Sequence, residues 1–175
     1  SGTSGQRGLF VFDRSEWRTV LGGFLLRSLA WAGLRPSPAR SVRLAIVASR
    51  SPLHMTSRAG ASLRGRRVQT LQLGAVESMA SIVARLNAHQ PDLLTGYPSI
   101  LGCLAEEQQS GRLSIRPRAV TTSGEALDAD LRDRVERAWG CRPFDLYGAT
   151  ECGAIASECE RHEGLHLYED HLIVE

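Results

Sequence analysis

Apolar runs alternate with amphipathic segments along most of the chain. The runs at 42–49 and 68–73 are rich in aliphatic and β-branched residues, which is typical of strands buried on both faces of a sheet. Residues 76–89 instead repeat apolar side chains at helical spacing, from Val76 to Leu86, until Pro91 stops the pattern. Further strands are predicted at 92–95, 118–123 and 143–148, with helices at 99–111 and 125–140 between them. This alternation predicts an α/β protein with a largely parallel sheet flanked by helices.

The two ends of the chain and the connection at 49–65 are less regular. Residues 8–12 are an apolar run that predicts a short strand, and a helix that Asp13 or Ser15 can cap is expected to follow and to end at Gly33. Residues 49–65 are expected to form a long polar connection. From Gly153 onward, short strand-like pieces alternate with polar turns. We therefore expect a partial α/β nucleotide-binding core over residues 1–150 and the truncated start of a β-rich subdomain over residues 151–175.

Composition narrows the function classes. The chain has 175 residues, 42% hydrophobic and 23% charged, as globular proteins do. Its net charge of +2 is too small to indicate a nucleic-acid partner. Neither a run long enough to span a bilayer nor a signal-peptide pattern occurs, so we expect a cytoplasmic protein without a membrane partner. The chain contains no lysine, which excludes a Schiff-base lysine or a Walker loop within it.

Chemically distinctive turns follow three of the predicted strands. In open α/β sheets, ligands bind beyond the carboxyl ends of the strands, and here these ends carry TGYPS, TTSGEAL and YGATE. Tyr147 can stack a planar base, while Thr150 and Glu151 can offer a hydroxyl to a phosphate and a carboxylate to a divalent cation. The same residues also suit a tyrosine packed under a turn and a solvated glutamate. The opening run SGTSG has the composition of a phosphate-binding loop or of a flexible tail.

Four motifs in a fixed order carry a family resemblance. SGTSG, TTSGEAL, DLYGATECG and ECERHEGLHLYEDH together resemble the adenylate-forming (AMP-dependent synthetase/ligase) superfamily, and more narrowly its phenylacetate-CoA ligase and coenzyme F390 synthetase branch. The resemblance extends over the whole chain and is strongest in its last third. It implies the fold of the N-terminal domain of these enzymes.

The resemblance assigns roles to individual positions. It implies that the ATP phosphates are covered by the loop Ser1, Gly2, Thr3, Ser4 and Gly5. It implies that the adenine is bordered by Ser123, Gly124, Glu125, Ala126, Asp145, Leu146, Tyr147 and Gly148, with the ring of Tyr147 stacked on it. Thr150 would contact the α-phosphate and Glu151 would bind Mg²⁺, as the catalytic pair. Tyr97 and Pro98 would lie beside the substrate.

The activity implied is acid activation. A carboxylic acid, aryl or acyl, would attack the α-phosphorus of ATP to give an acyl-adenylate, which coenzyme A would convert into a thioester. Two alternatives remain open: an adenylyltransferase of the coenzyme F390 synthetase type, and a nucleotide-binding module that has lost catalysis. A homodimer is also left open.

The resemblance raises two further expectations. Some members of the branch hold a structural zinc with a cysteine and a histidine from this region and two later cysteines, so Cys159 and His166 are candidate ligands. Because no CxxC pair supports a closed zinc site here, we expect an incomplete or metal-free one. The family's ribose-binding aspartate and catalytic lysine would follow Glu175. We therefore expect a portion of a longer enzyme that is inactive alone.

Overall fold

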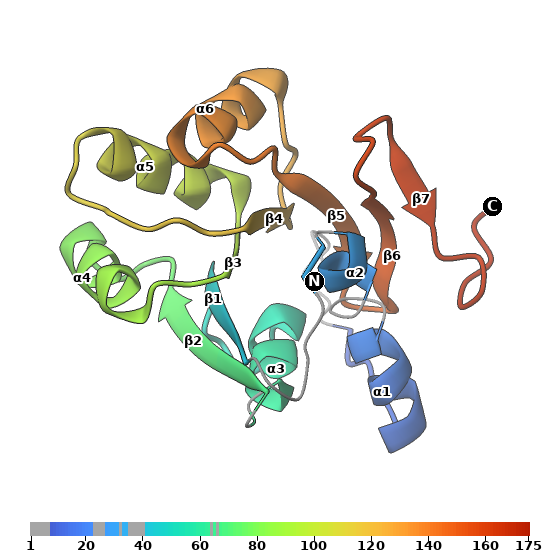
Figure 1. The fold of residues 1–175 in the computed structure, drawn as a ribbon. Helices are drawn as coiled ribbons and strands as arrows, with labels where there is room; N and C mark the ends of the chain where they lie inside the picture. Colours follow the sequence, from blue (N-terminus) through green and yellow to red (C-terminus); the bar gives the residue numbers. More distant parts are fainter. Residues whose placement is uncertain (1–7, 23–26, 32, 35–40, 64, 66) are drawn as a thin grey trace.

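One seven-stranded sheet organises the molecule (Figure 1). The computed structural model describes residues 8–22, 27–31, 33–34, 41–63, 65 and 67–175. The strands are β1 (Val42–Ala48), β2 (Val68–Gly74), β3 (Leu93–Gly96), β4 (Ala119–Ser123), β5 (Phe144–Ala149), β6 (Gly153–Glu158) and β7 (Leu165–Leu167), in the order β2-β1-β3-β4-β5-β6-β7. Strands β1 to β5 are parallel to one another. Strand β6 pairs antiparallel with β5, and β7 pairs antiparallel with β6. The predicted α/β architecture is confirmed.

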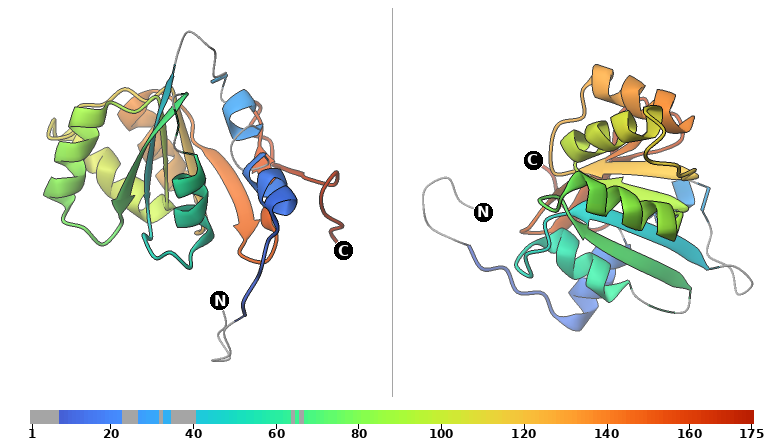
Figure 2. Two further views of the ribbon diagram at one scale, coloured as in Figure 1. Left: turned by 90° about the horizontal axis from the view of Figure 1, so that it is seen from below. Right: turned by 90° about the vertical axis from the view of Figure 1, so that its left-hand side faces the viewer.

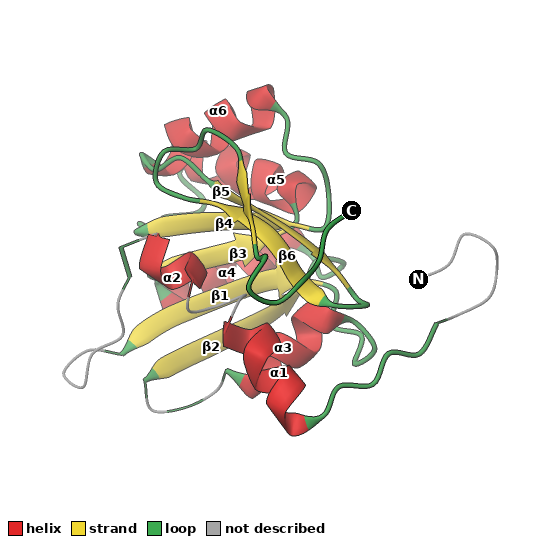
Figure 3. Cartoon of the chain, turned by 90° about the vertical axis from the view of Figure 1, so that its right-hand side faces the viewer, coloured by secondary structure: helices red, strands yellow, loops and turns green. Residues whose placement is uncertain are grey.

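Helices cover both faces of the sheet (Figure 2). They are α1 (Arg14–Leu21), α2 (Ser28–Trp31), α3 (Met55–Ser62), α4 (Met79–His89), α5 (Pro98–Gln109) and α6 (Ala129–Trp139). Helices α4, α5 and α6 bury one face, where Val47, Leu94 and Val120 are fully enclosed. On the other face, which Figure 3 shows with α2 and α3 in front of it, Leu44 and Ile46 lie in a second core cluster. Successive residues of β1 thus enter two cores, which explains its continuous apolar run.

The helix ends follow the residues that predicted them. Asp13 caps α1 in a capping box, because its carboxylate accepts the N–H of Glu16 while Glu16 accepts the N–H of Asp13. Asp128 accepts an N–H of the first turn of α6, and Gly140 ends that helix with a φ of 69°. Where one helix was expected up to Gly33, the described residues instead form α1, which ends at Leu21, and α2; Gly33, which follows α2, has a φ of 67°.

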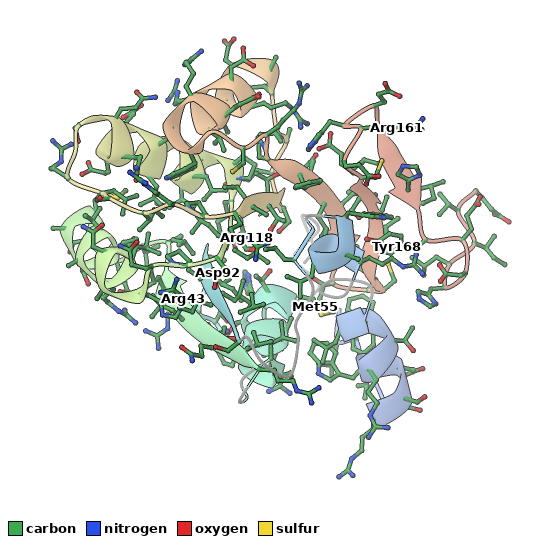
Figure 4. All side chains as sticks on the ribbon, viewed as in Figure 1. Arg43, Met55, Asp92, Arg118, Arg161 and Tyr168 are labelled. Carbon is green, nitrogen blue, oxygen red and sulfur yellow. The ribbon has the colours of Figure 1, made fainter. Side chains whose placement is uncertain are left out.

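The amino ends of the central strands are joined by Asp92 (Figure 4). Its carboxylate accepts the N–H of Arg43 at 2.9 Å, and its carbonyl accepts the N–H of Arg118 at 2.8 Å. Tyr168, buried behind β6, holds the end of the chain in place because its hydroxyl pairs with Ser157 at 2.5 Å. These polar contacts lie away from the carboxyl ends of the parallel strands.

Two sequence predictions were wrong at the edges of elements. Residues 8–12 do not form a strand: Leu9 is 85% exposed and Val11 82% exposed. An apolar run becomes a strand only where a neighbouring strand can pair with it, and this segment has no such partner among the described residues. Val76 is fully exposed, because α4 begins three residues later with Ser78 as its cap.

The connection at 49–65 contains a helix that the sequence analysis missed. Helix α3 places Ala59 and Gly60 against the sheet. A Cβ at Gly60 would lie 2.7 Å from the Cδ1 of Ile46, so the absence of a side chain lets the helix approach β1 closely. The signal was the run of small residues, Ala59, Gly60 and Ala61, within an otherwise polar segment.

The tail continues the main sheet. Strand β6 pairs with β5 from Gly153 to Ser157, and β7 pairs with β6. The proposed boundary between residues 150 and 151 stays a prediction. Within the described part of the chain, no helix has the length and apolar character needed to cross a membrane.

Candidate functional site

The three turns that follow β3, β4 and β5 meet at one edge of the sheet. The strands β3, β4 and β5 are adjacent and parallel, so the segments that follow them share the carboxyl-end edge. These segments are TGYPS, TTSGEAL and YGATE. The opening motif, Ser1 to Gly5, lies outside the described residues.

Gly124 brings two of these turns into contact. It has a φ of 84°, and a Cβ built on it would lie 3.1 Å from Cε1 and 3.2 Å from Cδ1 of Tyr97. The hydroxyl of Tyr97 accepts the N–H of Ser49 at 3.1 Å, which ties the same ring to the end of β1. The tyrosine therefore links three strand ends, and only glycine fits opposite its ring without strain.

Glu125 has a structural contact that the sequence did not indicate. Its carboxylate accepts the N–H of Ser99 at 2.9 Å and the hydroxyl of Ser99 at 3.0 Å. Ser99 lies in the first turn of α5, whose N-cap residue Tyr97 makes no side-chain capping bond. A carboxylate at this position satisfies a free N–H and complements the helix dipole. Glu125 thus fastens the TTSGEAL turn to α5.

Asp145 is held on β5 by hydrogen bonds. Its Oδ1 accepts the hydroxyl of Thr122 at 2.8 Å and the N–H of Leu146 at 3.1 Å. Burial raises the pKa of Asp145, although the bond from Thr122 opposes that shift. The carboxyl group is thus a fixed acceptor beside β4.

Glu158 on β6 is a second buried acid that supports the same strand. Both of its oxygens accept N–H bonds from the guanidinium of Arg132, at 2.8 and 2.9 Å, and Oε2 also accepts the N–H of Asp145 at 2.9 Å. The ring of His162 lies 3.1 Å from the same oxygen. Burial alone would raise the pKa of Glu158, but these bonds hold it below its usual value. The only sequence signal was an acid at the end of an otherwise apolar strand, GAIASE.

Tyr147, Thr150 and Glu151 lie at the carboxyl end of β5 and in the turn after it. The side chain of Tyr147 is 56% exposed, and the pairing with β6 shifts register between Tyr147 and Gly148. Thr150 is half-buried and Glu151 exposed in the turn that leads to β6. An aromatic ring, a hydroxyl and a carboxylate therefore lie within five residues at the same sheet edge.

Cys159 and His166 come together between β6 and β7. The Sγ of Cys159 lies 3.1 Å from the Nε2 of His166, beside a cavity of about 250 Å³ that Arg161 and Glu163 also line. In the described residues, no group of three or more His, Cys, Asp or Glu side chains could hold a metal ion. Sulfur and nitrogen are donors that zinc accepts, but a tetrahedral zinc site needs four ligands and this pair offers two.

A further cavity under α3 was not anticipated. Its volume is about 60 Å³, and it lies between α3 and the face of the sheet formed by β1, β3, β4 and β5. Ser123 and Leu146 line it, and these residues come immediately before Gly124 and Tyr147. The cavity thus adjoins the two turns that carry the predicted adenine-binding residues.

The fold and the cluster of turns place the chain among open α/β proteins that bind ligands at the carboxyl ends of parallel strands. A family described as AMP-binding enzymes matches residues 42–171. The chain belongs to this family of AMP-binding enzymes.

Individual relatives agree with this assignment. The chain is 25% identical to a phenylacetate-coenzyme A ligase of Thermus thermophilus over all of its own length and 39% of that protein. It is 36% identical to a benzoate–CoA ligase of Thauera aromatica over 41% of its own length and 14% of that protein. A solved structure of 2-hydroxyisobutyryl-CoA ligase with 2-HIB-AMP is 26% identical and superposes with a TM-score of 0.72, covering 97% of this chain and 37% of that chain. The chain therefore spans about two fifths of the length of the first of these relatives.

Proposed function

We propose that the protein activates a carboxylic acid with ATP and transfers the acyl group to coenzyme A, as a ligase similar to phenylacetate-CoA ligase. The observation that carries the proposal is the meeting of TGYPS, TTSGEAL and YGATE at one sheet edge in a chain of the AMP-binding family. The relatives with acid-CoA ligase names support the same reaction class.

The nucleotide would lie across the ends of β4 and β5. The exposed ring of Tyr147 suits stacking on adenine, and the positive φ of Gly124 lets the backbone approach the purine closely. Asp145 offers a fixed acceptor for an amino group. The loop from Ser1 to Gly5 would cover the phosphates.

The chemical step needs two anions to be brought together. The substrate carboxylate attacks the α-phosphorus of ATP, the bond to the pyrophosphate leaving group breaks, and the acyl-adenylate forms; the thiol of coenzyme A then displaces AMP. Thr150 would donate its hydroxyl to an α-phosphate oxygen and Glu151 would hold Mg²⁺, since hydroxyl and carboxylate oxygens suit that hard cation. Positioning and charge neutralisation supply most of such a rate enhancement.

Zinc is a separate part of the proposal. Cys159 and His166 would hold it together with ligands from elsewhere in the protein, and the metal would brace the turn between β6 and β7. A cytoplasmic location and a homodimer are likewise proposals.

The test is acid-dependent exchange of pyrophosphate into ATP by the full-length protein that contains this chain. We expect exchange with the wild type and a loss of at least about a hundredfold in Glu151→Gln, because removing one stabiliser of transition-state charge costs that much. Glu160→Gln, an exposed acid in the next turn, is the matched control and should keep full activity. Exchange that is unchanged in Glu151→Gln would contradict the assignment.

A second measurement distinguishes coenzyme A from a hydroxyl compound as the acceptor in the second step. Addition of coenzyme A should release AMP and yield a thioester. Transfer of AMP to a hydroxyl acceptor instead would indicate an adenylyltransferase. Magnesium-dependent ATP binding without any exchange would indicate a module that has lost catalysis.

A further inference from the structure

The chemical character of the cavity under α3 limits the kinds of acid substrate that it can accept. Its apolar lining includes Ile46, Ala59, Leu63 and Leu146, and no charged side chain of the described residues lines it. Such a wall favours an uncharged carbon chain, because burying a charge without a partner is costly.

Three of the five hydroxyl-bearing residues that line the cavity have their hydroxyls hydrogen-bonded within the protein. Thr95 and Thr121 share a hydrogen bond of 2.7 Å between their Oγ1 atoms. The hydroxyl of Thr122 donates to Asp145 at 2.8 Å. Polar recognition inside the cavity is therefore left to the hydroxyls of Thr56 and Ser123, beside a mainly apolar surface.

The size of the cavity sets an upper limit on the chain it accepts. A cavity of about 150 Å³ lined by aliphatic side chains binds benzene, which corresponds to roughly 25 Å³ for each ring carbon. On that scale the 60 Å³ found here holds about two or three carbon atoms. A phenyl group does not fit.

The cavity is small because α3 lies close to the sheet. Gly60 faces β1 and β2, where an added Cβ would come within 2.7 Å of Ile46 and 2.1 Å of the Nε2 of Gln72. The same amide nitrogen donates to the carbonyl of Ser57 at 2.9 Å, which fastens the helix to β2. The narrow space is thus a property of the packing of the helix, which a bound acid would have to break in order to widen it.

We propose that the acid substrate is a short aliphatic carboxylic acid of three or four carbons, with its chain in the cavity under α3 and its carboxylate at the ends of β4 and β5. The inference rests on the proposed acid activation and goes beyond it by naming the substrate class. Ser123 and Leu146 form the junction, because each lines the cavity and also belongs to the predicted adenine-binding residues.

The experiment compares acids in the pyrophosphate-exchange assay with the full-length protein. We expect kcat/KM for isobutyrate to exceed that for phenylacetate by at least about tenfold, since each misfitting carbon in an apolar pocket costs about a factor of ten or more. Exchange with phenylacetate that equals or exceeds exchange with isobutyrate overturns the size limit and leaves acid activation standing. Exchange with neither acid contradicts the proposed function itself.

Two variants test whether the preference for the smaller acid arises in the cavity. Leu63→Ala removes three carbons from the wall and should shift the kcat/KM ratio toward phenylacetate by about tenfold. Ala59→Val adds two carbons and should reduce use of isobutyrate more than use of acetate. Leu53→Ala makes the same change as Leu63→Ala at an exposed position of the same connection, and should leave the ratio unchanged. A ratio unaffected by Leu63→Ala and Ala59→Val, in proteins that melt like the wild type, would place the acid elsewhere.

Discussion

Gly124 shows how one residue can join two site segments. With a φ of 84°, any other residue there bears backbone strain, and a Cβ would also press on the ring of Tyr97 at 3.1 Å. We expect Gly124→Ala to lower the free energy of unfolding of the purified 175-residue chain by about 1–3 kcal/mol in a denaturant titration.

Gly111 provides the matched control for that substitution. Its φ is 78°, and a Cβ there would meet nothing within 4 Å. Gly111→Ala therefore reports the backbone strain alone, and the excess cost of Gly124→Ala measures the contact with Tyr97. Equal costs at the two positions would show that the ring moves aside freely.

The reactivity of the thiols of Cys103 and Cys141 toward an alkylating reagent tests how deeply each is buried. Burial, with a smaller contribution from Glu136, raises the pKa of Cys141 to about 11, whereas Cys103 is exposed on α5. Because the thiolate is the reactive species, iodoacetamide at pH 8 should modify Cys103 and leave Cys141 largely unmodified. Mass spectrometry of tryptic peptides would show this, and equal labelling of both residues in folded protein would contradict the packing described around Cys141.

At the scale of elements, α6 carries two ion pairs in different surroundings. The Arg132–Glu158 pair is buried, with 14% and 7% of the side chains exposed, whereas the Arg134–Glu106 pair is 41% and 63% exposed. Removing one partner of a buried pair leaves an uncompensated charge, at a cost of about 3–5 kcal/mol. We expect Arg132→Leu to show a loss of that size in denaturant titrations.

The exposed pair is the control on the same helix. Arg134→Leu should cost about 1 kcal/mol or less, because solvent screens exposed charges. Since Glu158 also accepts the N–H of Asp145, Glu158→Gln should weaken binding of ATP by the full-length protein, and Arg134→Leu should not. Similar losses of stability in Arg132→Leu and Arg134→Leu would mean that the buried network contributes little.

The local hydrophobic pattern was sufficient to predict helices that bury one face and strands that bury both faces. Apolar spacing predicted β1, β2 and helices α4 to α6. The glycines that follow α5 and α6 also agreed with the predicted ends of those two helices. Helix α3 was missed because its contact with the sheet depends on small residues and on Gly60 in particular, which a hydrophobic pattern does not register. The predicted strand at 8–12 was wrong because pairing depends on neighbours that a local pattern does not contain.

Across the whole molecule, sheet order explains how separated motifs can form one site. Residues 97, 124 and 147 lie far apart in sequence, but β3, β4 and β5 are neighbours, so their carboxyl ends adjoin. The sequence predicted that these three turns lie at one sheet edge, and the roles assigned to their residues stay a prediction. Their supports, Glu125 on Ser99 and Glu158 on Arg132, depend on tertiary contacts that no local motif encodes.

The same arrangement bears on what the 175 residues can do without the rest of a longer protein. The chain spans 39% of the length of the Thermus ligase and contains no lysine, whereas the family resemblance places the catalytic lysine on a later part of the fold. The proposed stacking on Tyr147 and hydrogen bonds at one sheet edge would hold a nucleotide weakly, but attack of one anion on another needs positive charge near the phosphates. We therefore expect the 175-residue protein to bind ATP weakly and to release almost no pyrophosphate with any acid, while circular dichroism shows it folded. The full-length protein in the same assay is the control, and efficient pyrophosphate release by the 175 residues alone would show that the residues at this sheet edge suffice for adenylation.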